Sequence, residues 1–156
     1  MGEINMKILV CTDGSEQSKK ALNVASVIAE RGNFDEVSII HVLPDKQDLS
    51  LVTYNSATYG EQAEEIRKKV IEMQSEEAKK ILREAVEVYK NKNINAETIL
   101  RQGHPAKTIL ELAAEQGFDI IFIGSRGLGG WKKRILGSVS SAVVQEAKNI
   151  SVVVVK

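Results

Sequence analysis

The sequence predicts an α/β fold in which a doubly wound sheet of five parallel strands is the middle of three layers. Two observations predict it: short apolar runs alternate with helical patterns, and each helical pattern has one apolar face. Strands that alternate with helices imply a parallel sheet covered on both faces. We expect the strand order 3-2-1-4-5, with the first strand central. The length of 156 residues suits one domain over residues 1–156.

The chain opens with a strand and a helix. The apolar run Lys7–Cys11 predicts the first strand. Ser15–Glu30 carries apolar residues at helical spacing, which predicts a helix with one buried face. Either Asp13 or Ser15 could cap this helix, because both side chains offer an oxygen to the free N–H groups of a first turn.

A second strand and a long helix follow. Glu36–Leu43 predicts the strand, and Pro44 ends it because proline cannot donate to a sheet ladder. The polar stretch Asp45–Gly60 has no clear period and is long for a loop, which suggests a mobile or functional segment. From Glu61 to about Asn91 the apolar spacing is helical.

The rest of the chain repeats the alternation. Ala96–Leu100 predicts the third strand. Pro105 suits the first position of a helix that ends near Gln116, and Gly117 follows as a stop. The chain then predicts a strand, a helix and a final strand over Asp119–Ile123, Val139–Ala147 and Ser151–Val155.

Composition excludes several kinds of function. The 21 basic and 21 acidic residues give a net charge of zero, so we expect no nucleic-acid or membrane partner. No apolar run approaches the roughly 18 residues that cross a bilayer, and no signal sequence opens the chain, so we expect a cytoplasmic protein. The single cysteine, Cys11, excludes an internal disulfide and is expected to be an inert core thiol.

A glycine-rich loop between the fourth strand and the last helix is the most informative motif. Gly124 and Gly127 are followed, after nine residues, by Gly137 and Ser138. Glycines let backbone approach a ligand closely, and the free N–H groups of a helix N-terminus attract phosphate. The loop therefore suggests a nucleotide phosphate site, although a surface loop with several glycines remains the alternative. It is not a dinucleotide fingerprint, because Lys132 stands where the third glycine belongs, and no Gly-Lys-Ser/Thr follows as in a Walker loop.

The fold brings a second segment to this loop. Ligands of doubly wound sheets sit beyond the carboxyl ends of the strands, where the winding reverses. Here that point lies between the first and fourth strands, so Thr12 and Asp13 should lie beside Gly124–Gly127. An aspartate after a strand and before a helix is also a common cap, so Asp13 has two possible roles.

The glycine pattern resembles the ATP-binding signature of universal stress proteins, G-x2-G-x9-G-[ST]. Further matching motifs occur in the same order: Ile8–Ser15, Gly103–Ala106, Asp119–Gly127 and Leu136–Ser140. The resemblance covers essentially the whole chain. It implies the adenine nucleotide alpha hydrolase-like fold and the ATP-binding subgroup of the family, because every signature position is filled.

The resemblance implies contacts to the base and the ribose. Thr12 and Asp13 would lie at the base and ribose, and Val42 would pack near the adenine. Cys11 departs from the proline often found at its position, where only a backbone contact to the ribose is expected.

The resemblance also implies a path for the phosphates, lined by Gly124 and Gly127. Four residues would hold the phosphates through backbone N–H groups and hydroxyls: Gly137, Ser138, Val139 and Ser140. Arg126 and the run Lys132–Arg134 either neutralise a triphosphate or form a solvated edge.

We expect an ATP-binding regulatory module rather than an enzyme. The sequence contains no recognisable Ser-His-Asp set, metal-ligand spacing or general base, so no catalytic or metal-binding residue is assigned. Mg²⁺ or Mn²⁺ would be held mainly by the phosphates. Slow ATP hydrolysis is an alternative. A flavodoxin-like flavin protein is less favoured, because a flavin site uses flanking aromatic residues and aromatics make up only 4% of the chain.

The last strand predicts the assembly. Val152–Val155 is apolar on both faces and lies at a sheet edge in the expected order, and such an edge invites pairing with another chain. We therefore expect a homodimer through this strand, as the family resemblance also implies. ATP would order Gly127–Gly137, and with it Asp45–Gly60, for an unidentified protein partner to recognise.

Overall fold

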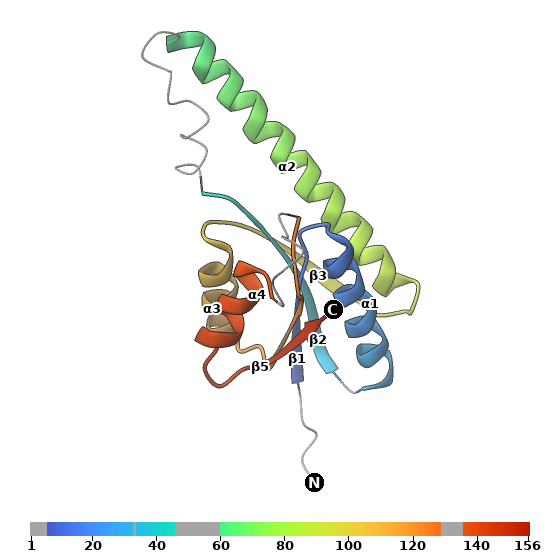
Figure 1. Cartoon of the computed structure of the whole chain (residues 1–156). Coiled ribbons are helices and arrows are strands. Elements are labelled where there is room, and N and C mark those ends of the chain that lie inside the picture. The colour runs from blue at the N-terminus through green and yellow to red at the C-terminus, as the bar shows by residue number, and fades with distance from the viewer. Residues whose placement is uncertain (1–5, 33, 46–59, 129–135) are drawn as a thin grey trace.

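The computed structural model describes residues 6–32, 34–45, 60–128 and 136–156, along which strands and helices alternate (Figure 1). The strands are β1 (Met6–Cys11), β2 (Phe34–Leu43), β3 (Ala96–Gln102), β4 (Ile120–Gly124) and β5 (Ser151–Val155). The helices are α1 (Glu16–Arg31), α2 (Gly60–Lys90), α3 (Pro105–Gln116) and α4 (Ser138–Glu146). Every predicted element is present, with ends that differ from the prediction by at most two residues.

The sheet has the order β3-β2-β1-β4-β5, and each neighbouring pair is parallel. The predicted fold class and strand order are therefore confirmed. Helices α1 and α2 cover one face of the sheet, and α3 and α4 cover the other (Figure 1). The chain leaves β1 towards one face and β4 towards the opposite face, so the winding reverses between these two central strands.

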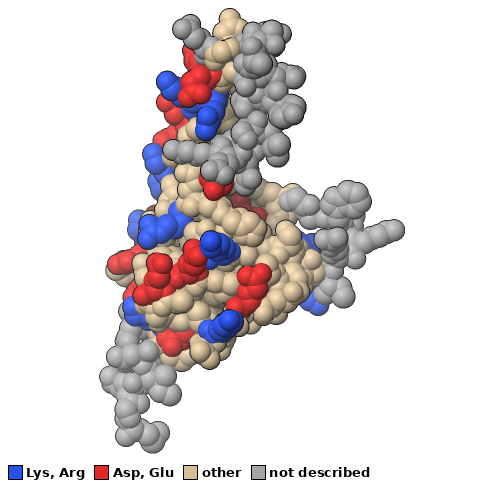
Figure 2. Space-filling model, turned by 90° about the vertical axis from the view of Figure 1, so that its left-hand side faces the viewer, with Lys and Arg blue, Asp and Glu red and all other residues tan. Residues whose placement is uncertain are grey.

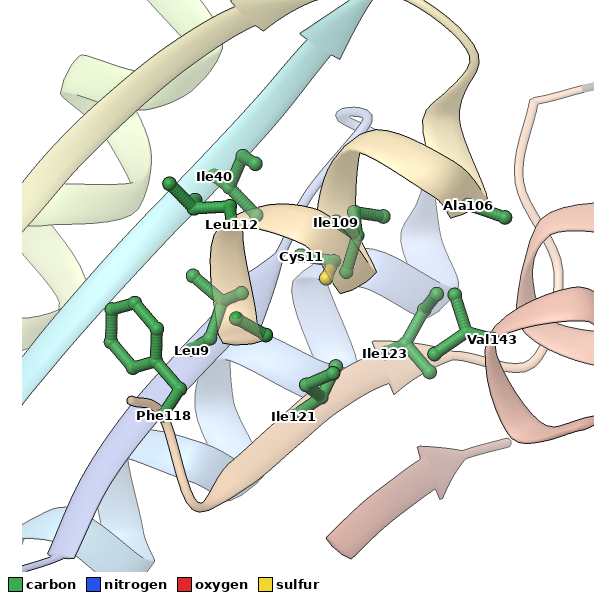
Figure 3. Close-up of a cluster of buried hydrophobic side chains, with 11 residues drawn as sticks. Leu9, Cys11, Ile40, Ala106, Ile109, Leu112, Phe118, Ile121, Ile123 and Val143 are labelled. Carbon is green, nitrogen blue, oxygen red and sulfur yellow. The ribbon is translucent and has the colours of Figure 1, made fainter. Parts of the chain in front are cut away.

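Alternate residues of the central strand enter two separate cores. Leu9 and Cys11 belong to a cluster beneath α3 and α4, which Figure 3 shows, whereas Ile8 and Val10 belong to a cluster beneath α1 and α2. Leu9, Ile8 and Val10 are completely buried. A strand buried on both faces explains why its sequence is a continuous apolar run rather than an alternating one.

The helix ends follow the expected local rules. Ser15 is the N-cap of α1, and its Oγ accepts a hydrogen bond of 3.2 Å from the Ser18 N–H, so the cap is Ser15 and not Asp13. Pro105 is the first residue of α3. Gly117 ends this helix in the left-handed conformation with φ 69°, which glycine adopts without steric cost.

Helix α2 is much longer than the part of it that packs on the sheet. Its second half packs on the sheet through buried Ala78, Leu82, Ala85 and Tyr89. Its first half extends beyond the rest of the described structure (Figure 1). The predicted functional segment before this helix, Asp45–Gly60, lies outside the described residues except for its two ends.

The surface carries charges of both signs side by side. Several are paired along helices, such as Lys79 with Glu76 at 2.9 Å and Lys90 with Glu87 at 2.8 Å. Figure 2 shows basic and acidic side chains interspersed on one face. None of the described helices combines the length and the apolar composition that crossing a membrane requires.

Candidate functional site

A cavity of about 730 Å³ opens where β1, β2 and β4 end and where α3 and α4 begin. All eleven residues that the sequence singled out line this cavity: Cys11, Thr12, Asp13, Val42, Gly124, Arg126, Gly127, Gly137, Ser138, Val139 and Ser140. The cavity lies at the carboxyl ends of β1 and β4, where the winding of the sheet reverses. The structure therefore brings together three segments that are far apart in the sequence.

Asp13 joins the first of these segments to the glycine-rich loop. Its Oδ1 accepts the Ser15 N–H at 2.9 Å, and its Oδ2 accepts the Leu128 N–H at 3.2 Å. The missing side chain of Gly127 is what gives the carboxylate room, because a Cβ there would collide with Asp13 Oδ2. Asp13 is thus a tie between two loops of the site, and both of its oxygens already accept a hydrogen bond.

The three signature glycines differ in what surrounds them. A Cβ on Gly124 would lie 2.7 Å from the backbone carbon of Gln17 and 2.8 Å from the backbone nitrogen of Ser18. Gly124 therefore lets β4 end against the first turn of α1. A Cβ on Gly137 would meet nothing closer than 3.4 Å, which is ordinary van der Waals contact, and φ at Gly137 is −72°. Neither packing within the described protein nor backbone conformation requires a glycine at position 137.

The first turn of α4 presents donors to the cavity. The N–H groups of Ser138, Val139 and Ser140 precede the first hydrogen bonds within the helix, and they have no acceptor among the described residues. Two other expected phosphate donors, the Gly137 N–H and the Ser140 hydroxyl, instead form hydrogen bonds within the protein. The Gly137 N–H donates to the Ser125 carbonyl at 2.7 Å, and the Ser140 hydroxyl bonds the same carbonyl at 2.9 Å. Gly137 and Ser140 therefore fix the start of the helix.

The end of β2 contributes a free backbone edge. The Ile40 carbonyl accepts the Thr12 N–H at 2.9 Å, and the Leu43 carbonyl accepts the Gly103 N–H at 2.9 Å. Ile40 therefore faces β1 and Leu43 faces β3, so by alternation the N–H and C=O of Val42 face the β1 side. The paired part of β1 ends at Cys11, and Val42 has no backbone partner on that side among the described residues.

Sequence reasoning missed much of the apolar wall and one polar residue. The additional lining residues are Ser18, Ile40, Pro105, Ile109, Ile123, Leu128 and Leu136. The apolar spacing of Ile40, Ile109 and Ile123 indicates burial, but it does not distinguish a core position from a cavity wall. Ser18 is buried and bonds Thr12 through its hydroxyl at 3.2 Å. The sequence could have indicated Ser18, because it lies in the first turn of the helix that follows Thr12–Ser15.

Cys11 forms part of the floor of the cavity and is almost completely buried. Burial raises the pKa of its thiol far above the ordinary value, and the neighbouring charge of Asp13 raises it further. The thiol is therefore neutral near pH 7, as expected of an inert core cysteine.

Comparison with known proteins decides the family. The family model described as the universal stress protein family matches residues 5–156. The chain belongs to this family. The universal stress protein YxiE of Bacillus subtilis is 41% identical over 144 residues, which are 89% of this chain and 91% of that protein.

Solved structures agree with this assignment. The protein MJ0577 of Methanocaldococcus jannaschii has a TM-score of 0.71 at 28% identity, over 97% of this chain and 95% of that one. A universal stress protein in complex with cAMP has a TM-score of 0.63 at 25% identity, over 97% of this chain and 96% of that one.

The described residues that line the cavity offer mainly apolar side chains, hydroxyl groups and backbone groups. Asp13 is the one carboxylate among the described lining residues, and two backbone N–H groups hold it. No group of three or more His, Cys, Asp or Glu side chains placed to hold a metal occurs among the described residues. Arg126 lines the cavity and forms no ion pair with a described residue. The predicted basic run Lys132–Arg134 lies outside the described residues.

Proposed function

We propose that this universal stress protein binds ATP in the cavity and acts as a nucleotide-dependent regulatory module in the cytoplasm. One observation carries the proposal: the N-terminus of α4 opens on the cavity with three N–H groups that have no acceptor among the described residues, beside a glycine that packing does not require. Free N–H groups and the positive end of a helix dipole favour a phosphate. Ser138, Val139 and Ser140 would donate to it, and Arg126 would contribute positive charge.

Gly137 is explained by a ligand better than by the fold. Gly137 lines the cavity, and a methyl group there would meet only ordinary contacts with the described residues. Without a side chain at position 137, a phosphate can approach the backbone at the start of α4 closely. Gly124 and Gly127, in contrast, are needed within the protein itself.

The end of the cavity at Val42 suits adenine. Val42 offers a backbone donor and acceptor side by side, and adenine offers an acceptor nitrogen next to an amino donor. The walls there are apolar, with Ile40, Pro105 and Ile109 among the lining residues, as in most sites for planar ligands. The complex of a related family member with cAMP supports an adenine nucleotide here as well.

Binding without rapid hydrolysis is the activity we propose. Hydrolysis needs a group that orients water at the γ-phosphate, and Asp13, the one carboxylate among the described lining residues, ties two loops together. Mg²⁺ would be held mainly by the phosphates, because the described lining residues offer one carboxylate and several hydroxyls. Since Asp13 ties the β1 loop to the glycine-rich loop, a ligand on either loop would affect both, which suits a signal that a partner protein recognises.

Isothermal titration of the purified protein with ATP–Mg²⁺, AMP, cAMP and GTP tests the proposal. We expect saturable binding of adenine nucleotides and weaker binding of GTP. Gly137→Ala should weaken ATP binding roughly tenfold or more, because the methyl group fills the phosphate approach. Without nucleotide its free energy of unfolding should stay within about 1 kcal/mol of the wild type. If neither the wild type nor Gly137→Ala releases heat at millimolar ATP, the proposal fails.

We also propose that two copies pair through β5, which pairs only with β4 in the described sheet. The neighbouring helices carry exposed apolar side chains on both sides of this strand: Val24, Val27 and Ile28 on α1, and Val144 on α4. Both helices contact β5. A two-fold axis beside β5 would bring each helix against its copy, so burial of these side chains would support the sheet contact.

A further inference from the structure

The β1–β2 ladder stops one step earlier than its geometry allows. Its last bond runs from the Thr12 N–H to the Ile40 carbonyl at 2.9 Å. In a parallel pair the next bond would join the Val42 N–H to the Thr12 carbonyl, and the one after it would join the Gly14 N–H to the Val42 carbonyl. Neither bond is present, although the strands run together up to Cys11 and Ile40.

Side chains take the place of both missing bonds. The Thr12 carbonyl accepts a hydrogen bond from His41 Nδ1 at 2.8 Å. The Gly14 N–H donates to the Thr12 hydroxyl oxygen at 3.3 Å. The Ser18 hydroxyl donates to the Ser15 carbonyl at 2.9 Å, so the Thr12 hydroxyl is the donor in its 3.2 Å contact with Ser18.

We propose that His41 is a positioning residue: its Nδ1–H occupies the Thr12 carbonyl and thereby keeps the backbone edge of Val42 open to a nucleotide base. The part that concerns the base rests on the proposed function, whereas the interrupted ladder does not. Residues alternate between the faces of a strand, so the ring of His41 lies on the α1–α2 face with Ile39, whereas Val42 lies on the α3–α4 face with Ile40. His41 therefore acts on a ligand through Thr12 and Val42, not by contact.

The bonding pattern fixes the chemical state that this role needs. A carbonyl oxygen can only accept, so the Nδ1 of His41 carries the hydrogen. A side chain without a donor would release the Thr12 carbonyl, which could then turn back to the strand and accept the Val42 N–H. Thr12 supports the same arrangement, since its hydroxyl oxygen holds the Gly14 N–H that would otherwise reach the Val42 carbonyl.

Amide hydrogen exchange of the nucleotide-free protein tests the interrupted ladder directly. In the wild type the Val42 amide should exchange much faster than the Ile40 amide, because Ile40 lies within the ladder and the Val42 N–H has no acceptor among the described residues. In His41→Leu the Val42 amide should become roughly fivefold or more protected, as a typical backbone hydrogen bond implies. A wild-type Val42 amide as protected as Ile40 overturns the proposal even if the variant does not fold.

Nucleotide titration tests the consequence for binding. His41→Leu should weaken ATP binding roughly fivefold, without a loss of thermal stability, since the Val42 N–H then bonds the Thr12 carbonyl and no longer the base. His41→Asn, which keeps an N–H donor near the Nδ1 position, should restore both the fast Val42 exchange and the affinity. His104→Phe changes the other histidine, which lies outside the cavity lining, and should leave both unchanged. Equal ATP affinity in His41→Leu and the wild type overturns the positioning role, whereas a wild type that binds no nucleotide contradicts only the proposed function.

Discussion

Single residues of the site have two roles, because they line the cavity and also hold its loops together. Gly137 and Ser140 meet at the carbonyl of Ser125, which accepts from both. This shared acceptor sets the direction in which α4 begins. The N–H groups of the next three residues have no acceptor among the described residues, because no helical carbonyl lies one turn before them. The two bonds to the Ser125 carbonyl hold the start of α4 in place before any ligand binds, which lowers the cost of ordering its backbone groups for binding.

Cys11 gives a prediction for alkaline solution. Its pKa is raised in the folded protein by burial, whereas in the unfolded chain it has an ordinary value of about 8.5. The folded state therefore holds this proton more tightly, and its contribution to stability is complete below the unfolded pKa and is lost as pH rises above it. The free energy of unfolding should fall by about 1 kcal/mol from this group between pH 8 and pH 9.5.

Urea unfolding at several pH values checks this effect. Cys11→Ala removes the titrating group, so its unfolding free energy should be lower throughout but should decline less over this interval. Burial also raises the pKa of Tyr89, but an ordinary tyrosine titrates near pH 10, so its contribution to this interval is small. Parallel curves for the wild type and Cys11→Ala would show that the thiol is not held neutral by the fold.

The sequence predicted which residues gather at one cavity, but not the contacts that they make there. All eleven predicted residues line one cavity, since a parallel sheet gathers the ends of its strands. Nothing in the sequence shows that the Gly137 N–H is already bonded, that Asp13 is held at both oxygens, or that His41 reaches the carbonyl of Thr12. These facts depend on contacts between residues far apart in the chain, which spacing alone does not encode.

At the scale of elements, the close contact between the end of β4 and the first turn of α1 brings Gly124 and Ser18 together at the cavity. Gly124 lets the end of β4 approach the first turn of α1 so closely that backbone lies against backbone. Helix α1 in turn holds Ser18 beside Thr12. This packing keeps the ends of β1 and β4 in register at the cavity.

Gly124→Ala should therefore destabilise the protein by about 1–3 kcal/mol even without nucleotide, because backbone atoms cannot move aside as a side chain can. Denaturant unfolding measures this loss. Gly60→Ala is a matched control, since a Cβ there meets nothing within 4 Å among the described residues. If Gly124→Ala and Gly60→Ala unfold at the same denaturant concentration, the close approach of β4 and α1 is not a constraint.

The elements themselves were well predicted because their signals are local. The continuous apolar run of β1 and the proline and glycine at the ends of α3 are present in the sequence as short patterns. The differences lie at the ends, for example at β3, which continues to Gln102 although its apolar run ends at Leu100. There the ladder with β2 extends the strand, since Leu43 is paired with Gln102.

At the scale of the whole molecule, the strand order places the site away from the exposed edge at β5, but hydrogen bonds of Ser125 link the two. The site lies at the central strands, and β5 lies at the border of the described sheet. The Ser125 N–H donates to the Val155 carbonyl at 2.7 Å, and the Ser125 carbonyl holds the start of α4. A partner that pairs with β5 would therefore lie one strand away from the phosphate end of the cavity.

Proline substitution can test the proposed dimer because the two sides of β5 are distinguishable. The Ser151 N–H donates to the Asp119 carbonyl at 2.9 Å, and the Val155 carbonyl accepts from Ser125, so residues 151, 153 and 155 face β4. Val152 and Val154 consequently face the open edge. Val154→Pro removes an outward N–H and should give a monomer in analytical ultracentrifugation while the fold persists, because proline is tolerated at an outward edge position.

Val153→Pro is the contrasting variant, because its missing N–H belongs to the ladder with β4. It should lower the free energy of unfolding by at least about 1 kcal/mol, whatever its state of assembly. A wild-type protein that sediments as a monomer would exclude the dimer itself. A Val154→Pro variant that remains dimeric would exclude β5 as the contact, and the exposed apolar side chains of α1 and α4 would then have to be explained without a second copy at this edge.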